Sequence, residues 1–449
     1  MMEYSVVSVT AANFLAFVCF TALSWTSPEL PKLVNSTDSP FYHDLSNDEQ
    51  SWIGAFMPLG TILGPITFGY LSDHFGRKTT LLLISVPMQG CYLLQAFAKK
   101  LYLFYISRFA MGVAVGGLLT VLPMYIAELS LDEHRGVLSV SMGVFFCLGE
   151  LLCYVAGPYM SIVAFNCLLA AIAATIFVVF LIVGSETPHY HIFKNQHDRA
   201  KAVLLKIRAT GEEAIEKELE HIKHVIENEE STSLMDIFNS KGLRKAEIIS
   251  FFLLIFQQIS GIFAVLSYSQ QIFQDAGSSL SGEYCAIIVG VVQLISSLLT
   301  TSIANIFGRR TLLLFSGFGM ALSEAILGTY SYLDKNGTDV TSLSFVPIVS
   351  LIAYIVTYNF GFGPIVWTVV SEMFPNNIRA LATAFNTSLC CVVTFFISKY
   401  FPTVSDSFGI GVCFLAFSAT CFAGGLFSYF FVLETKGKSL KQIQDELNG

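Results

Sequence analysis

The chain has 449 residues, of which 54% are hydrophobic and only 13% are charged, and its formal net charge is −8. Because soluble domains average about 25% charged residues, this composition excludes a water-soluble globular protein. The negative balance gives no reason to expect a nucleic-acid partner, and the histidines are scattered without a nucleophile, base and orienting group, so no enzyme chemistry is indicated. The cysteines fall almost entirely within apolar segments and lack ligand spacing, so neither a metal nor another cofactor is predicted.

Apolar segments long enough to cross a bilayer recur along the whole chain, beginning with residues 4–28. Most contain no Asp, Glu, Lys or Arg over about 19 residues or more, which is enough to cross a hydrocarbon core of roughly 30 Å. Three further segments carry one internal charge each, namely Arg108, Glu150 or Glu324. The first segment does not look like a cleaved signal peptide, because no basic stretch precedes it and its apolar run is too long. We therefore predict an all-α polytopic membrane protein with twelve transmembrane helices.

The distribution of basic residues predicts the orientation of these spans. If both termini are cytoplasmic, the inner loops carry most of the Lys and Arg residues, as the positive-inside rule requires. Two glycosylation sequons, at Asn35 and Asn336, then both fall in outer loops. We expect glycosylation at these two asparagines.

A polar segment divides the spans into two groups of six. The predicted parts are an N-terminal six-helix bundle (1–183), a cytoplasmic helical linker (184–245), a C-terminal six-helix bundle (246–432) and a short cytoplasmic tail (433–449). Apolar residues in the linker recur at helical spacing, which predicts short amphipathic helices.

An internal repeat relates the two bundles. A short motif containing Gly-Arg follows both the second and the eighth span, and further acidic and basic residues recur at equivalent cytoplasmic positions of the two bundles. The repeated residues, first half before second, are Arg77 and Arg309, Glu128 and Glu372, Arg135 and Arg379, and Glu186 and Glu434.

These motifs resemble those of the sugar porters of the major facilitator superfamily over nearly the whole chain. The matching segments are Asp73 to Lys78, Arg108 to Gly116, Pro123 to Gly136, Ser185 to Pro188, Gln257 to Gly261, Gly308 to Arg310, Gly361 to Trp367 and Glu434 to Gly437. The end of the first span is similar to the insect branch that transports trehalose and hexoses. The resemblance implies two pseudo-symmetric six-helix bundles, transport of a small sugar by alternating access, and a plasma-membrane monomer embedded in the lipid bilayer.

The resemblance also implies salt bridges that gate the cytoplasmic mouth. Arg77 is expected to pair with Glu128, and Arg309 with Glu372. Glu186 and Glu434 are expected to add carboxylates near the remaining pair of repeated arginines, Arg135 and Arg379. The alternative is that these residues only determine topology, since Lys and Arg after a span commonly do so.

Five residues are candidates for binding the solute: Gln257, Gln258, Gln293, Asn359 and Trp367. Two adjacent glutamine amides suit hydrogen bonding to vicinal hydroxyls, and a Trp ring can cover the apolar side of a pyranose. Gln293 and Asn359 match family contact positions. The alternatives are that the glutamines bond helix to helix and that Trp367 is an interfacial anchor.

The chain also departs from the family pattern. Phe263, Gly143 and Cys390 with Cys391 stand where sugar porters usually carry polar side chains that bind hydroxyls. Weak hexose binding or a different ligand is therefore expected, which keeps two alternatives open: a transporter of a polyol or other non-sugar solute, and a non-transporting sugar sensor. The first span, 4–28, has no deep carboxylate, which favours facilitated, proton-independent transport.

Arg108 and Glu150 lie at similar expected depths in consecutive spans. Because an isolated charge in a bilayer is costly, they are expected to form an ion pair. Separate hydrogen bonds, or a place for Glu150 along the solute path, are the alternatives.

Overall fold

The computed structural model describes residues 4–35, 39–41, 44–130, 132–208, 212–227, 240–275, 280–438 and 440–448. The helices before the linker are α1 (Tyr4–Ser24), α2 (Thr26–Asn35), α3 (Asn47–Thr61), α4 (Gly64–Phe75), α5 (Arg77–Phe97), α6 (Leu101–Leu129), α7 (Asp132–Ala156), η1 (Gly157–Tyr159) and α8 (Ile162–Val183). Those of the linker are α9 (Pro188–Phe193), α10 (His197–Ile207) and α11 (Glu212–Glu227). The rest are α13 (Lys241–Ile259), α14 (Ile262–Asp275), α15 (Gly282–Ile306), α16 (Arg309–Lys335), η2 (Thr341–Leu343), α17 (Val346–Phe360), α18 (Pro364–Met373), α19 (Asn376–Phe408), α20 (Ile410–Phe431) and α21 (Leu440–Asn448).

Within the described residues, 12 helical segments are long and apolar enough to cross a membrane. This confirms the predicted all-α polytopic class. The segments are Tyr4–Val34, Asn47–Phe75, Arg77–Phe97, Leu101–Leu129, Ser141–Tyr159, Ile162–Val183, Lys241–Gln274, Gly282–Thr300, Arg309–Lys335, Val346–Met373, Leu381–Phe408 and Ile410–Phe431.

Two of the spans are interrupted at a glycine where a neighbouring side chain leaves no room for a Cβ atom. The break between α13 and α14 contains Gly261 at φ +82°, a backbone conformation that side chains disfavour. A Cβ there would lie 2.5 Å from the ring of Phe417. Between α17 and α18, a Cβ on Gly361 would lie 2.3 Å from the Ser316 side chain. Both breaks therefore depend on glycine.

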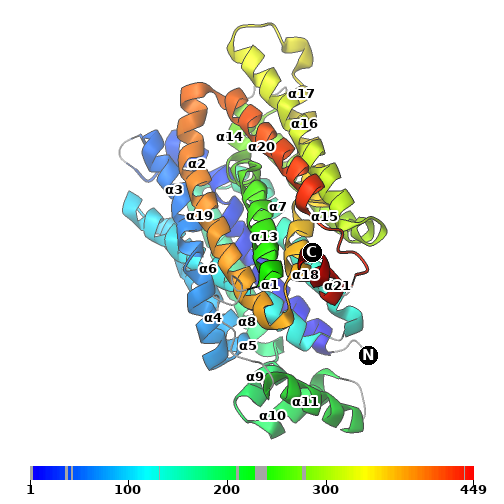
Figure 1. Cartoon of the computed structure of the whole chain (residues 1–449). Helices are drawn as coiled ribbons and strands as arrows, with labels where there is room; N and C mark the ends of the chain where they lie inside the picture. Colours follow the sequence, from blue (N-terminus) through cyan, green and yellow to red (C-terminus); the bar gives the residue numbers. More distant parts are fainter. Residues whose placement is uncertain are drawn as a thin grey trace. The chain divides into compact units, whose positions relative to one another are not determined.

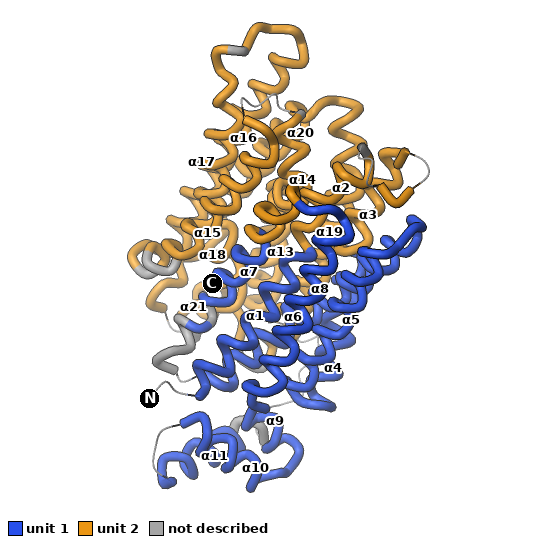
Figure 2. The backbone as a smooth tube through the Cα atoms, turned by 180° about the vertical axis from the view of Figure 1, so that it is seen from behind, with its two compact units in different colours: residues 1–22, 59–150, 160–231 blue, residues 23–58, 151–159, 232–449 orange. Residues whose placement is uncertain are grey.

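The chain forms two compact units (Figure 2), residues 1–22, 59–150 and 160–231 in one and residues 23–58, 151–159 and 232–449 in the other. In the first unit, α5 packs against α6 and α8, and α4 packs against α6. In the second unit, α16 packs against α17 and α20, α13 against α19 and α20, and α2 against α14. The predicted bundle boundaries at 183 and 246 are not tested by this division and stay a prediction.

The linker helices α9, α10 and α11 lie together in Figure 1. A small core of Ile192, Ala200 and Ile222, with Leu219 against it, joins them. In the second unit, the tail helix α21 packs against α13.

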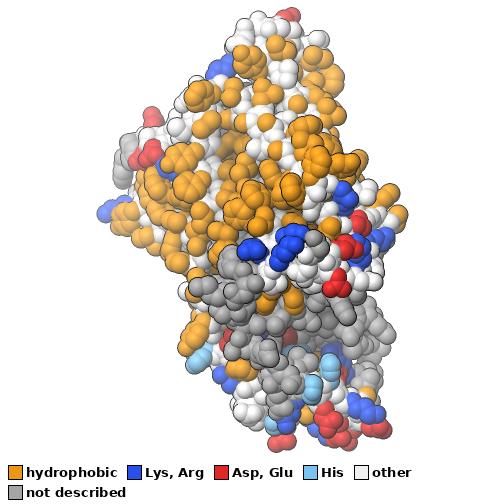
Figure 3. Space-filling model, viewed as in Figure 1, with side chains coloured by type: hydrophobic (Ala, Val, Ile, Leu, Met, Phe, Trp, Pro, Cys, Tyr) orange, Lys and Arg blue, Asp and Glu red, His pale blue; other side chains and the backbone are white. Residues whose placement is uncertain are grey.

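The surface is unlike that of a soluble protein. Figure 3 shows hydrophobic side chains over much of the visible face, while charged and histidine side chains gather where α9, α10 and α11 lie. Large apolar side chains are exposed on the spans, for example Ile66, Ile182 and Phe430. Because water penalises such a surface, these side chains are placed to face lipid.

Candidate functional site

The break between α17 and α18 is held by a glutamine of α13. Nε2 of Gln257 donates to the carbonyl oxygens of Phe362 at 2.6 Å and of Gly363 at 2.9 Å. On the other side of the break, the amide of Phe362 donates to Oγ of Ser316 at 2.9 Å. The interruption would leave these backbone groups without helical partners, and side chains of α13 and α16 supply them.

The neighbouring glutamine extends this contact to α19. Nε2 of Gln258 donates to Oε1 of Gln257 at 3.4 Å, and the hydroxyl of Thr394 donates to Oε1 of Gln258 at 2.9 Å. Gln257 and Thr394 are buried, and Gln258 is half-buried. Thr394 was not predicted as a site residue. Its signal in the sequence is weak, since a lone threonine in a span usually bonds its own helix, as Thr394 also does to Cys390 O.

The other predicted binding residues lie in the same unit on neighbouring helices. Asn359 closes α17 just before the break, and its carbonyl accepts from Thr300 of α15 at 3.0 Å. The Asn359 amide nitrogen donates within its own helix to Ile355 O at 3.0 Å. Gln293 is buried on α15, and Trp367 is half-buried on α18, directly after the break. The contacts above join Gln257 and Gln258 to the break, whereas binding of a solute by these five residues stays a prediction.

The positions that depart from the family pattern are all buried or half-buried. Phe263 is half-buried at the start of α14, and Cys390 and Cys391 are buried on α19, one helical turn before Thr394. Gly143 is half-buried on α7 of the first unit. Phe263 and the two cysteines therefore stand where the family usually carries polar side chains, and they cannot bind hydroxyls strongly.

A cluster of charges joins three segments of the first unit. Nε of Arg77 lies 3.1 Å from Oε1 of Glu128, the partner predicted for it. Oε1 of Glu186 accepts from the backbone amides of Arg77 at 2.8 Å and Lys78 at 3.0 Å. The carboxylate thus caps the N-terminus of α5, where the helix dipole favours an anion. Burial raises the pKa of Glu186, while the amides that it accepts from act in the opposite direction.

The second unit repeats this arrangement. Nη2 of Arg309 lies 3.1 Å from Oε1 of Glu372, and Glu434 accepts from the backbone amides of Arg309 at 2.8 Å and Arg310 at 3.2 Å. The glycine before each arginine makes room for the capping carboxylate. A Cβ on Gly76 would lie 2.3 Å from Oε2 of Glu186, and one on Gly308 would lie 2.1 Å from Oε2 of Glu434. The Gly-Arg repeat therefore encodes a helix cap as well as an ion pair.

Some predicted residues lie partly or wholly outside the described residues. The side chains of Arg135, Arg379 and Asn35 are among them, so their expected pairing and glycosylation stay predictions. Asn336 is exposed directly after α16, a position open to modification.

Arg108 and Glu150 are both buried in the first unit. Nη1 of Arg108 donates to the carbonyl of Ala22. The predicted pairing of the two charges stays a prediction.

The second unit also contains a cluster at the ends of α3 and α19 that the orientation rule places outside. The ammonium of Lys399 bonds to Asp48 and lies 2.8 Å from Oγ of Ser51 and 4.4 Å from the centroid of the Trp52 ring. Nearby, the hydroxyl of Tyr268 donates to Ser398 O at 3.2 Å. The start of the second span is thereby fastened to α19, which Tyr268 in turn joins to α14. Lys399 was not predicted as a site residue.

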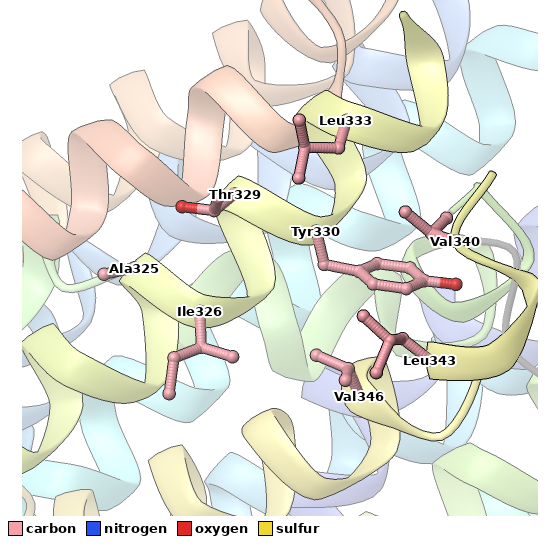
Figure 4. A pocket seen from close by; sticks show the side chains of 8 residues that line it. All are labelled: Ala325, Ile326, Thr329, Tyr330, Leu333, Val340, Leu343 and Val346. Carbon is pink, nitrogen blue, oxygen red and sulfur yellow. The ribbon is translucent and has the colours of Figure 1, made fainter. Parts of the chain in front are cut away.

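A cavity of about 360 Å³ lies between α16 and α17. The Tyr330 ring lies among Val340 and Leu343 there (Figure 4), and the lining is almost wholly apolar. Such a lining does not suit a polyhydroxylated solute.

The profile of the family described as "Sugar (and other) transporter" matches residues 8–447. The chain belongs to this sugar transporter family. Its members are transporters and not enzymes, which agrees with the lack of enzyme chemistry expected from the sequence.

Relatives within the sugar transporter family include insect proteins named facilitated trehalose transporters. The Tret1 protein of Anopheles gambiae is 34% identical over 95% of this chain and 54% of its own length. That of Polypedilum vanderplanki is 34% identical over 99% of this chain and 88% of its own length. This chain therefore spans about half the length of some of the curated relatives that it matches and most of the length of others.

The solved structure of the xylose transporter XylE from E. coli, in an inward-open conformation, has the same fold. Its TM-score is 0.80 at 24% identity, and the match covers 99% of each chain. This likeness confirms the predicted major facilitator fold. The 12 apolar spans found among the described residues and the family together make the chain a multi-pass membrane protein.

Proposed function

We propose that this chain catalyses facilitated transport of a sugar, such as trehalose or a hexose, across the plasma membrane by alternating access. The observation that carries the proposal is the pair Gln257 and Gln258 beside a broken helix: Gln257 donates to the free carbonyls of the break, and Gln258 donates to Gln257. Polar amides within a span are costly unless they serve a path or a neighbouring helix. The names of the insect relatives favour trehalose as the first sugar to test.

The proposed site consists of Gln257, Gln258, Gln293, Asn359 and Trp367. The two charge clusters, with Arg77, Glu128 and Glu186 in one and Arg309, Glu372 and Glu434 in the other, are the proposed inner gate. The transporter is proposed to be a monomer with both termini cytoplasmic and with glycans at Asn35 and Asn336.

Facilitated rather than proton-coupled transport is supported by the first span. The first carboxylate after the predicted segment 4–28 is Glu29, and its Oε1 lies 2.8 Å from the ammonium of Lys32. The segment 4–28 itself contains no Asp or Glu that could carry a proton through the membrane.

The test is uptake by proteoliposomes of labelled trehalose, glucose and a panel of polyols, with and without an inward proton gradient. The proposal expects saturable sugar uptake that stops at equal concentrations whatever the gradient. Accumulation that follows the pH gradient would contradict the facilitated mechanism. Uptake of polyols alone would favour the alternative that the apolar Phe263 suggests, and binding without uptake would favour a sensor.

A further inference from the structure

The hydrogen bonds around Gln257 form a directed chain. The Thr394 hydroxyl shares its proton between Oε1 of Gln258 and the carbonyl of Cys390 on its own helix, the Gln258 amide donates to Gln257, and the Gln257 amide donates to the carbonyls of Phe362 and Gly363. The chain runs from α19 through α13 to the break that precedes α18. Each step satisfies the acceptor of the next residue, so the orientation of Gln257 depends on Thr394.

This chain leaves Gln257 no spare donor. A primary amide has two N–H groups, and the two carbonyls of the break take both of them. The side chain of Gln257 is only 2% exposed, so water does not compete for these bonds. A solute hydroxyl that accepts from Gln257 must therefore take a hydrogen bond away from the break.

The break in turn precedes α18, a helix whose C-terminal end carries one residue of the second charge cluster. α18 follows it directly, carries Trp367 in its first turn, and bears Glu372, which binds Arg309 at 3.1 Å. A freed carbonyl in a buried site is costly, so the break would move to find another partner. Movement of the break changes where α18 starts and hence how Glu372 meets Arg309.

We propose that the hydrogen bonds from Gln257 to the α17–α18 break, here called the clip, hold the break in place until a solute competes for them. Thr394 is the positioning residue that orients Gln257 for these bonds. The inference rests on the proposed function for its solute. A sugar that recruits the Gln257 amide releases the break and, through α18, loosens the ion pair of Glu372 with Arg309. The clip thereby couples occupancy of the site to the inner gate.

The test measures backbone hydrogen exchange in peptides covering residues 358–373, on the purified full chain in lipid nanodiscs. Thr394→Val removes the hydroxyl and keeps the shape, and it should raise exchange in this segment several-fold without any sugar. Thr394→Ser restores a hydroxyl and should return exchange towards the wild-type level. The matched control is Thr387→Val on the same helix, because among the described residues the Thr387 hydroxyl donates to Thr383 O of its own helix and to no other helix.

A second arm adds trehalose, or glucose if only glucose is transported. Sugar should raise exchange in the wild-type segment and should add little in Thr394→Val, where the clip is already loosened. Wild-type exchange that sugar leaves unchanged or lowers would overturn the proposal, as would Thr394→Val with wild-type exchange in the sugar-free arm. The sugar-free arm does not depend on transport, so raised exchange in Thr394→Val together with absent uptake would count against the proposed function alone.

Discussion

The ammonium nitrogen of Lys399 lies 2.8 Å from Oγ of Ser51, and through this contact and the bond to Asp48 one lysine of α19 fastens the start of α3. The Lys399 side chain is largely buried, whereas 73% of the Asp48 side chain is exposed. Solvent therefore screens the ion pair, and the cluster as a whole is worth about 1 kcal/mol.

Lys399→Met should raise the population of an open state in which the start of α3 is no longer held to α19. About 1 kcal/mol corresponds to a several-fold change in the population of an open state. The measurement is labelling of a Ser27→Cys variant by a membrane-impermeant maleimide. Ser27 is suitable because it is buried and its Oγ accepts from the backbone amide of Gln270. Lys335→Met, on an exposed lysine, is the control and should label as slowly as the parent. Equal labelling in Lys399→Met and the control would contradict a closing role.

Arg77→Ala and Glu372→Ala should each lower sugar uptake several-fold while surface expression is preserved. Each change breaks one ion pair, Arg77 with Glu128 or Arg309 with Glu372, and so removes contacts that stabilise one arrangement of the inner gate. Uptake into intact cells, normalised to surface protein, is the measurement. Lys217→Ala removes an exposed pair in the linker and should leave uptake unchanged. Undiminished transport in both gate variants would show that these charges only set topology.

Glu186→Gln should change how stability depends on pH. Because burial raises the folded-state pKa of Glu186 above that of an ordinary glutamate, the folded protein holds the proton more readily than the unfolded chain. As pH rises from the pKa of Glu186 in the unfolded chain to its higher pKa in the folded protein, the wild type should therefore lose stability relative to Glu186→Gln. Below this pH range the two proteins should be equally stable. Melting temperatures across the acidic to neutral range measure this. The exposed Glu213→Gln should show no such divergence, and a wild type that gains on Glu186→Gln with rising pH would refute the assignment.

Phe263→Asn should strengthen hexose binding. One restored hydrogen bond contributes about 0.5–1.5 kcal/mol, which predicts a gain in affinity of roughly two- to tenfold. Competition binding of glucose to purified protein measures it. Phe263→Leu, which changes the ring but adds no amide, is the control. If Phe263→Asn folds normally and gains no affinity, the missing amide is not what limits hexose binding.

Both residues are buried, and under the predicted pairing Arg108→Gln or Glu150→Gln leaves the other charge without its partner, so each should reduce the amount of folded protein at the cell surface. A charge-swapped double variant, Arg108→Glu with Glu150→Arg, should recover part of the loss. Surface biotinylation followed by size-exclusion chromatography gives the measurement. Strictly additive losses would rule out the ion pair.

The sequence by itself determined the membrane class, the twelve spans and the family. Span length against bilayer thickness is a one-dimensional property, so apolar runs with no charge, or with a single internal one, were sufficient to find the helices. The family resemblance likewise indicated Arg77 with Glu128 and Arg309 with Glu372, and the internal repeat places the same residue types at equivalent positions of both halves.

Only the tertiary structure decided what the polar groups at the ends of the spans and inside them contact. Glu186 and Glu434 cap helix N-termini because the folded Gly-Arg turns present free backbone amides to them, which residue spacing does not reveal. Gln257 bonds to Phe362, 105 residues away, and Thr394 reaches Gln258 across 136 residues. The direction of an amide depends on which helix lies beside it, and that neighbour is fixed by packing between distant segments.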